Sequence, residues 1–122
     1  MTDRELLELA AKAYFHKEVE DGICSFWWDE KENAIVYING ENQDHNGNDV
    51  ELLWIPLDED GDALRLAVKL KMRVETNAEG AFAAILGPFM EPWAFEFVGD
   101  DACAATRLAI TRVAADFGKS MP

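Results

Sequence analysis

The stretch W-I-P-L-D-E-D-G-D-A-L-R-L-A-V-K-L-K, residues 54–71, decides the fold because it joins a strand to a short helix through a sharp turn. Pro56 has no amide hydrogen to donate to a neighbouring strand, so the strand is predicted to end near Ile55. Apolar residues spaced three and four apart predict one buried helix stripe of Ala63, Leu66, Ala67 and Leu70. Carboxylates suit the free amides and the positive dipole end of a first helical turn, and four lie there: Asp58, Glu59, Asp60 and Asp62.

Two further helices are predicted at the ends of the chain. Thr2 and Glu5 form a capping box, and apolar residues at helical spacing follow it, which predicts a helix over about residues 3–17. Residues 99–101, G-D-D, are expected to cap a final helix of roughly residues 101–117, with Gly118 as its natural end.

The remaining segments alternate between apolar and polar residues or run apolar, which is typical of strands. The predicted strands cover residues 23–28, 34–38, 50–55, 73–76, 81–86 and 93–98. Short turns join most of them, so we predict an α+β fold in a single domain, residues 1–122. It has a mainly antiparallel sheet of five to six strands with three helices packed on one face, in two layers. Trp93, Phe95 and Phe97 share one side of their strand and are assigned to the core.

Two motifs resemble a family of proteins. The pattern W-x-P-L-x-x-D-G-D-A-L-R-L-A-V-K-L lies at residues 54–70, and G-D-D-x-x-A-A-T-R-x-A-I-x-R-x-A-A lies at residues 99–115. With the opening R-E-L-L-E-L-A-A-K-A, residues 4–13, they resemble a group of small uncharacterised accessory proteins of tailed bacteriophages and prophages. The resemblance covers a little under half of the chain and implies a phage setting but no activity. Residues 39–49 depart from the pattern of the group as an extra loop.

The negative charge of the chain is concentrated in one segment. Residues 18–62, called the acidic segment below, hold 14 of the 24 acidic residues and a single basic residue, Lys31. The other segments hold ten residues of each sign, so the acidic segment carries the whole formal charge of −13. Such a field repels nucleic acids and membrane surfaces and attracts basic partners, although a merely solvated acidic surface explains the same composition.

One aromatic residue is expected beside these acids. Trp27 and Trp28 are adjacent in one predicted strand and point to opposite faces, so both cannot enter a one-sided core. We expect Trp27 to be partly exposed; the alternative is a strand covered on both faces. Together with acids of the predicted turns and loops, it forms the candidate partner-binding set. The set is Trp27, Asp29, Glu30, Glu32, Glu41, Asp44, Asp49, Asp58 and Asp60.

The sequence does not predict catalytic or metal chemistry. Asp58, Asp60 and Asp62 match the first three ligand positions of a calcium loop, but glycine follows at the fourth position instead of the sixth. The chain has only two histidines, two cysteines and two serines, so it offers few residues for a nucleophilic triad. Cys24 and Cys103 lack the spacing of a disulfide framework and are expected to be reduced and buried. We therefore expect no enzyme activity, no cofactor and no metal.

Two functions fit these features. The first is an acidic phage protein of the host cytoplasm that binds and inhibits a basic surface of a host protein. In one version it mimics nucleic acid and so counters a host defence factor. The second is a non-catalytic structural or homo-oligomeric phage protein, in which an apolar surface makes a homodimer and the acidic side is only solvated. Neither binds nucleic acid directly, and no run of residues is long and apolar enough for a membrane span.

Overall fold

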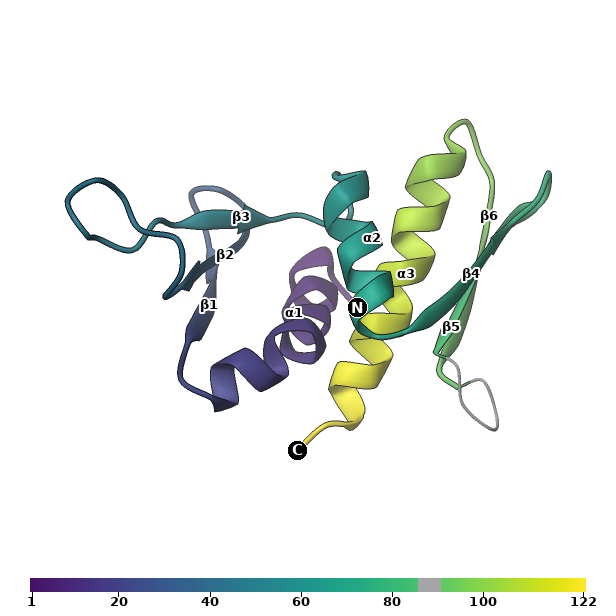
Figure 1. Cartoon of the computed structure of the whole chain (residues 1–122). Helices are drawn as coiled ribbons and strands as arrows, with labels where there is room; N and C mark the ends of the chain where they lie inside the picture. The colour runs from purple at the N-terminus through teal and green to yellow at the C-terminus, as the bar shows by residue number, and fades with distance from the viewer. Residues whose placement is uncertain (86–90) are drawn as a thin grey trace.

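The computed structural model describes residues 1–85 and 91–122 as three helices and six strands (Figure 1). The helices are α1 (Asp3–Glu20), α2 (Asp60–Lys69) and α3 (Ala102–Ser120). The strands are β1 (Cys24–Asp29), β2 (Ala34–Asn39), β3 (Leu52–Trp54), β4 (Met72–Thr76), β5 (Gly80–Ile85) and β6 (Trp93–Phe97). The α+β class is therefore confirmed. The predicted end of the fifth strand, Leu86, lies outside the described residues.

The strands form two sheets instead of the single predicted one. Strands β1, β2 and β3 make the first sheet and β4, β5 and β6 make the second, and both are antiparallel with neighbours in chain order. Each sheet is thus a meander, and α2 separates one meander from the other. Alternating patterns predict that strands exist, but they do not predict which distant strands share a sheet.

The helices lie between the two sheets, so the architecture has three layers and not two (Figure 1). Phe15 of α1 packs on the first sheet, with its ring 5.5 Å from Phe26 and 4.9 Å from Tyr37. Helix α3 packs on β5 and β6 of the second sheet and also against α1. Within the two described ranges, no helix combines the length and the hydropathy needed to cross a membrane.

The segment between the two sheets follows the predicted order of strand, turn and helix. Trp54 is buried at the end of β3, and the amide of Ile55 donates a hydrogen bond to Asp62 Oδ2 at 2.9 Å. This bond ties the end of the strand to the first turn of α2. The N-cap residue Glu59 makes no side-chain capping bond, so Asp62 holds the helix start. The predicted stripe is buried at Ala63, Leu66 and Ala67.

The contact between α1 and α3 corrects the prediction for Gly118. The Asp101 carboxylate caps α3 as expected, because it accepts from the Ala104 amide at 3.0 Å, but the helix continues past Gly118 to Ser120. Gly118 is buried, and a Cβ atom placed on it would lie 2.0 Å from the carbonyl oxygen of Leu9 in α1. Gly118 therefore permits a close approach of two helices instead of ending one.

The second sheet has its aromatic residues on the uncovered face. The prediction that Trp93, Phe95 and Phe97 lie in the core is wrong, since they are 57%, 36% and 80% exposed. The other face meets α3 through small side chains, including Ala81 and Ala83, which are fully buried. Alternation defines two faces of a strand but does not say which of them the rest of the chain covers.

Candidate functional site

A row of apolar side chains crosses the outer face of the first sheet. The strand register places Trp27 of β1 opposite Val36 of β2, and Val36 opposite Leu53 of β3. Directly opposite residues share a face, and the other face is the one that packs on Phe15. Trp27 is half-buried and Leu53 is 45% exposed, with Val36 covered between them. We call these three residues the Trp27 row.

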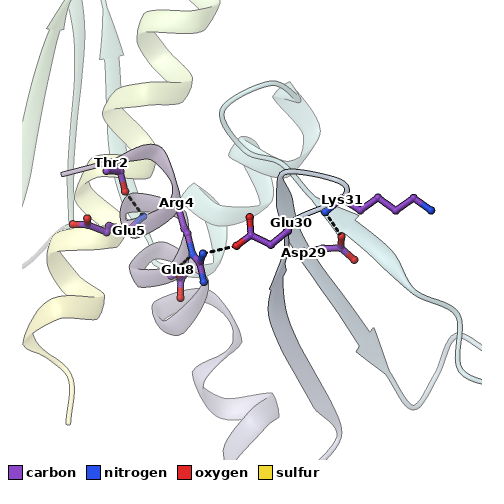
Figure 2. A network of polar contacts seen from close by, with 7 residues as sticks. All are labelled: Thr2, Arg4, Glu5, Glu8, Asp29, Glu30 and Lys31. Carbon is purple, nitrogen blue, oxygen red and sulfur yellow. Dashed lines mark hydrogen bonds and ion pairs between the residues drawn. The ribbon is translucent and has the colours of Figure 1, made fainter.

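The turn between β1 and β2 carries three of the predicted acids. Asp29 Oδ1 accepts from the amides of Lys31 and Glu32 at 2.9 and 3.0 Å, so this carboxylate closes the turn. Glu30 lies 2.7 Å from the guanidinium of Arg4, which reaches it from α1 (Figure 2). The Glu32 carboxylate is exposed and makes no hydrogen bond or ion pair within the described residues. One of the three acids is therefore free to meet a partner.

Arg4 links the turn to the first helix. Its guanidinium contacts Glu8 at 2.8 Å as well as Glu30 (Figure 2). It also lies 5.5 Å from the centre of the Trp28 ring. The hydrogen bond with Glu8 is the main reason that the pKa of Arg4 is raised, with the charges of Glu8 and Glu30 adding to it. Arg4 comes from outside the acidic segment and neutralises part of its charge.

The loop between β2 and β3 folds on itself and projects away from the helices (Figure 1). Asp44 Oδ1 accepts from the amides of Asn48 and Asn46 at 3.0 and 2.8 Å, and these hydrogen bonds lower the pKa of Asp44. Asp49 pairs with Gln43 through the backbone in an isolated bridge. The carboxylates of Glu41 and Asp49 are exposed and have no partner among the described residues. The loop therefore presents two free acids on a hydrogen-bonded frame.

At the start of α2 one predicted acid is also paired and another is free. Arg107 of α3 donates to the carbonyl oxygen of Leu57 at 2.8 Å and to Asp60 Oδ1 at 2.7 Å. The hydrogen bond to Asp60 is the main cause of a raised pKa of Arg107. Asp60 thus serves the contact between α2 and α3. Asp58 is exposed, and its carboxylate has no partner in the described part of the chain.

The structure does not bring all the predicted acids into one cluster. The β1–β2 turn and the start of α2 lie at one end of the first sheet, because β3 runs antiparallel to β2 and leaves it at that end. The loop with Glu41 and Asp49 begins at the other end of β2, which is about 17 Å away for a strand of this length. The free carboxylates Glu32, Glu41, Asp49 and Asp58 therefore belong to segments at the two ends of the sheet that carries the Trp27 row.

A hollow of about 500 Å³ lies where α1, the β1–β2 hairpin and the end of α2 meet. Tyr14 and Tyr37 line it together with the ion pair of Glu18 and Lys69. Burial opposes the charge of Glu18, but hydrogen bonds, chiefly from Lys69, outweigh burial and lower the pKa of the carboxyl. Burial also raises the pKa of the Cys24 thiol, so Cys24 stays protonated and is a poor nucleophile.

Among residues 1–85 and 91–122, no three His, Cys, Asp or Glu side chains are grouped to hold a metal ion. Cys103 is free and exposed near the start of α3, so the expectation of two buried thiols is correct only for Cys24.

Sequence reasoning missed Val36 and Leu53 as parts of the outer face. The signal was present, because alternation along the strand of residues 52–54 places Leu53 on the face opposite to Trp54. Comparisons of the chain with family models, with curated proteins and with solved structures gave no match.

Proposed function

We propose that this chain is an accessory protein of a phage or prophage that binds a basic surface of a host protein in the host cytoplasm, and that it acts by binding instead of catalysis. The phage setting is supported by the resemblance of residues 54–70 and 99–115. The observation that carries the binding role is the Trp27 row on a sheet whose two ends hold carboxylates with no partner among the described residues.

The Trp27 row and the free acids at the two ends of its sheet match the anatomy of a protein interface. Such interfaces have an apolar centre, in which aromatic residues are enriched, and a polar rim. Trp27 and Leu53 supply the centre, and the free acids supply the rim. Rim charges of one sign steer a basic partner toward the face and raise the association rate, and they do so less as salt increases.

In the nucleic-acid-mimic version, the carboxylates occupy phosphate positions in the DNA- or RNA-binding groove of a host defence or regulatory factor. The two groups of acids, about 17 Å apart along the sheet, would contact separate basic positions on that groove. Such a complex inhibits the host factor by competition, so added DNA or RNA must displace the protein.

The test is capture of host proteins by the tagged chain at low and high salt, with two matched variants. The first replaces Glu32, Glu41, Asp49 and Asp58 by their amides, and four rim charges of ordinary strength predict a loss of affinity of about tenfold to a hundredfold. The second replaces four exposed acids outside the acidic segment, Glu79, Glu91, Asp100 and Asp116, and removes the same charge.

A partner that both variants lose equally would respond to net charge alone and would contradict the assigned face. A chain that captures only itself would favour the second function, a homo-oligomer whose acidic side is solvated.

A further inference from the structure

The uncovered face of the second sheet carries an ordered group of aromatic side chains. Phe82 lies opposite Phe95 in the strand register, and the Phe82 ring also stacks on Trp93 with centres 6.2 Å apart. Phe95 and Phe97 meet edge to face at 5.2 Å. We call Phe82, Trp93, Phe95 and Phe97 the aromatic face.

Gly80 is part of the arrangement. It lies opposite Phe97 in the register, and a Cβ atom on it would lie 2.4 Å from Cζ of Phe95. The Phe95 ring therefore lies flat over the space where a side chain would be, as aromatic rings do over glycines in antiparallel sheets. This fixes the ring on the sheet and makes the aromatic face broad and shallow.

Packing among the described residues does not account for this surface. The inner face of the sheet already packs on α3 through alanines, and no described element covers the outer face. With aromatic side chains of about 200 Å² each, the exposed fractions of Trp93, Phe95 and Phe97 leave roughly 350 Å² of apolar area in water. That is in the range of the largest apolar patch on a typical monomer, and such patches are often functional.

Charge indicates that the occupant is not a basic protein. The charged pair on this face is Arg73 and Glu75 of β4, which bond to each other and leave no net charge there. A neutral face of this kind does not attract the basic surface that the acidic segment attracts. It suits a partner that is neutral and apolar at its own contact surface.

We infer that the aromatic face binds the same face of a second copy in a twofold dimer. A twofold interface repeats one patch on both partners, so the patch must not repel itself. The acidic segment would repel itself, but its strands form the first sheet, on the far side of the helix layer (Figure 1). Layers about 10 Å apart put the two sheets roughly 20–30 Å from each other, beyond the Debye length of about 8 Å in physiological salt.

The size of the patch sets the expected strength. A standard interface covers about 800 Å² on each partner, and the exposed aromatic area supplies somewhat less than half of it. The surrounding side chains of β4 and β6 must supply the remainder. We therefore expect a dimer that forms in the micromolar range and dissociates on dilution, and not an obligate one.

Sedimentation velocity of the full chain between roughly 1 and 100 µM tests this inference. The wild type should shift from monomer to dimer across that range. Phe97→Glu should weaken the dimer at least tenfold, because it places a carboxylate from each copy in the apolar contact. Phe97 is 80% exposed, so this change should not affect folding, which circular dichroism checks. Leu64→Gln on α2, also at an exposed apolar residue, is the matched control and should dimerise as the wild type does.

Salt separates this dimer from binding of a basic host protein. The contact is apolar and the acidic segments lie beyond the Debye length, so higher salt should not weaken the dimer, whereas it should weaken host binding. A wild type that stays monomeric at the highest concentration overturns the inference. A dimer that Phe97→Glu and a second variant, Trp93→Lys, both leave intact also overturns it, because the contact must then use another surface.

Discussion

Replacing Gly118 by alanine should destabilise the fold, although alanine is the better helix former. The added Cβ atom would lie 2.0 Å from the Leu9 carbonyl oxygen and 3.0 Å from its carbonyl carbon. Ordinary contact is about 3.5 Å, so α1 and α3 must separate by roughly 1.5 Å at this point. Both atoms belong to the backbone of α1, and a rotamer change cannot relieve the clash.

The size of the effect follows from two opposed contributions. Overpacking of a closely packed contact costs about 3 kcal/mol at the upper end of its usual range. The higher helix propensity of alanine returns about 1 kcal/mol. The net loss should be about 2 kcal/mol, which lowers Tm by roughly 6–10 °C in a chain of this size.

Urea denaturation followed by circular dichroism measures this loss, and Gly61→Ala is the control. Gly61 also lies inside a helix, α2, but its nearest neighbours are side-chain atoms of Arg65 at 3.3 Å or more, which can move. Gly61→Ala should therefore raise stability by up to about 1 kcal/mol. A Gly118→Ala protein as stable as the wild type would show that α1 and α3 do not approach as closely as described.

Three further outcomes are expected. Arg107→Met should lower the free energy of unfolding, measured by urea denaturation, by about 2 kcal/mol, because the half-buried guanidinium donates to a backbone carbonyl. Asp60→Asn should lower it by under about 1 kcal/mol, since that side chain is 73% exposed. The lowered pKa of Glu18 adds stability above its ordinary value near 4.3, and this stability is lost as pH falls through the lower folded value; Glu18→Gln should remove that part of the acid-side slope of stability against pH. Trp27→Ala should weaken binding of the captured host protein at least tenfold, whereas Trp93→Ala should not, and the reverse ranking would assign host binding to the other sheet.

Local signals in the sequence predicted the elements of the fold well. The Thr2 hydroxyl accepts from the Glu5 amide at 3.1 Å, and Asp101 caps α3, because a cap depends only on residues three positions away. The β1–β2 hairpin also has the predicted strands on the two sides of a charged turn. These features use contacts between residues that are close in sequence.

Contacts between distant residues account for what the sequence did not predict. Phe97 lies on the exposed face because Ala81 and Ala83, on the other face of the sheet, meet α3. The alternating patterns of β5 and β6 do not show which of the two faces is covered. Gly118 near the end of a helical pattern looks like a terminator, and only the position of Leu9 reveals its role. Each case depends on where another element packs.

The candidate site also combines a feature that local sequence predicted with features that depend on distant residues. The partial exposure of Trp27 follows from alternation with a neighbouring tryptophan, so the sequence indicated it. The partners of Glu30 and Asp60 are Arg4 and Arg107, which come from distant helices, and no spacing in the sequence pairs them. The sequence therefore predicted which segment carries the negative charge, but not which of its acids form ion pairs within the chain.

The order of the layers has a consequence for valency. Because the two sheets lie on opposite sides of the helices, joining two copies through the second sheet leaves both first sheets at the far ends of the assembly (Figure 1). If the proposed function and dimer hold, such an assembly would be bivalent, with its two binding arms directed away from each other. A target that repeats its basic site at the matching span would be held with an avidity about 10² to 10⁴ times the affinity of one arm, and an isolated site would gain nothing.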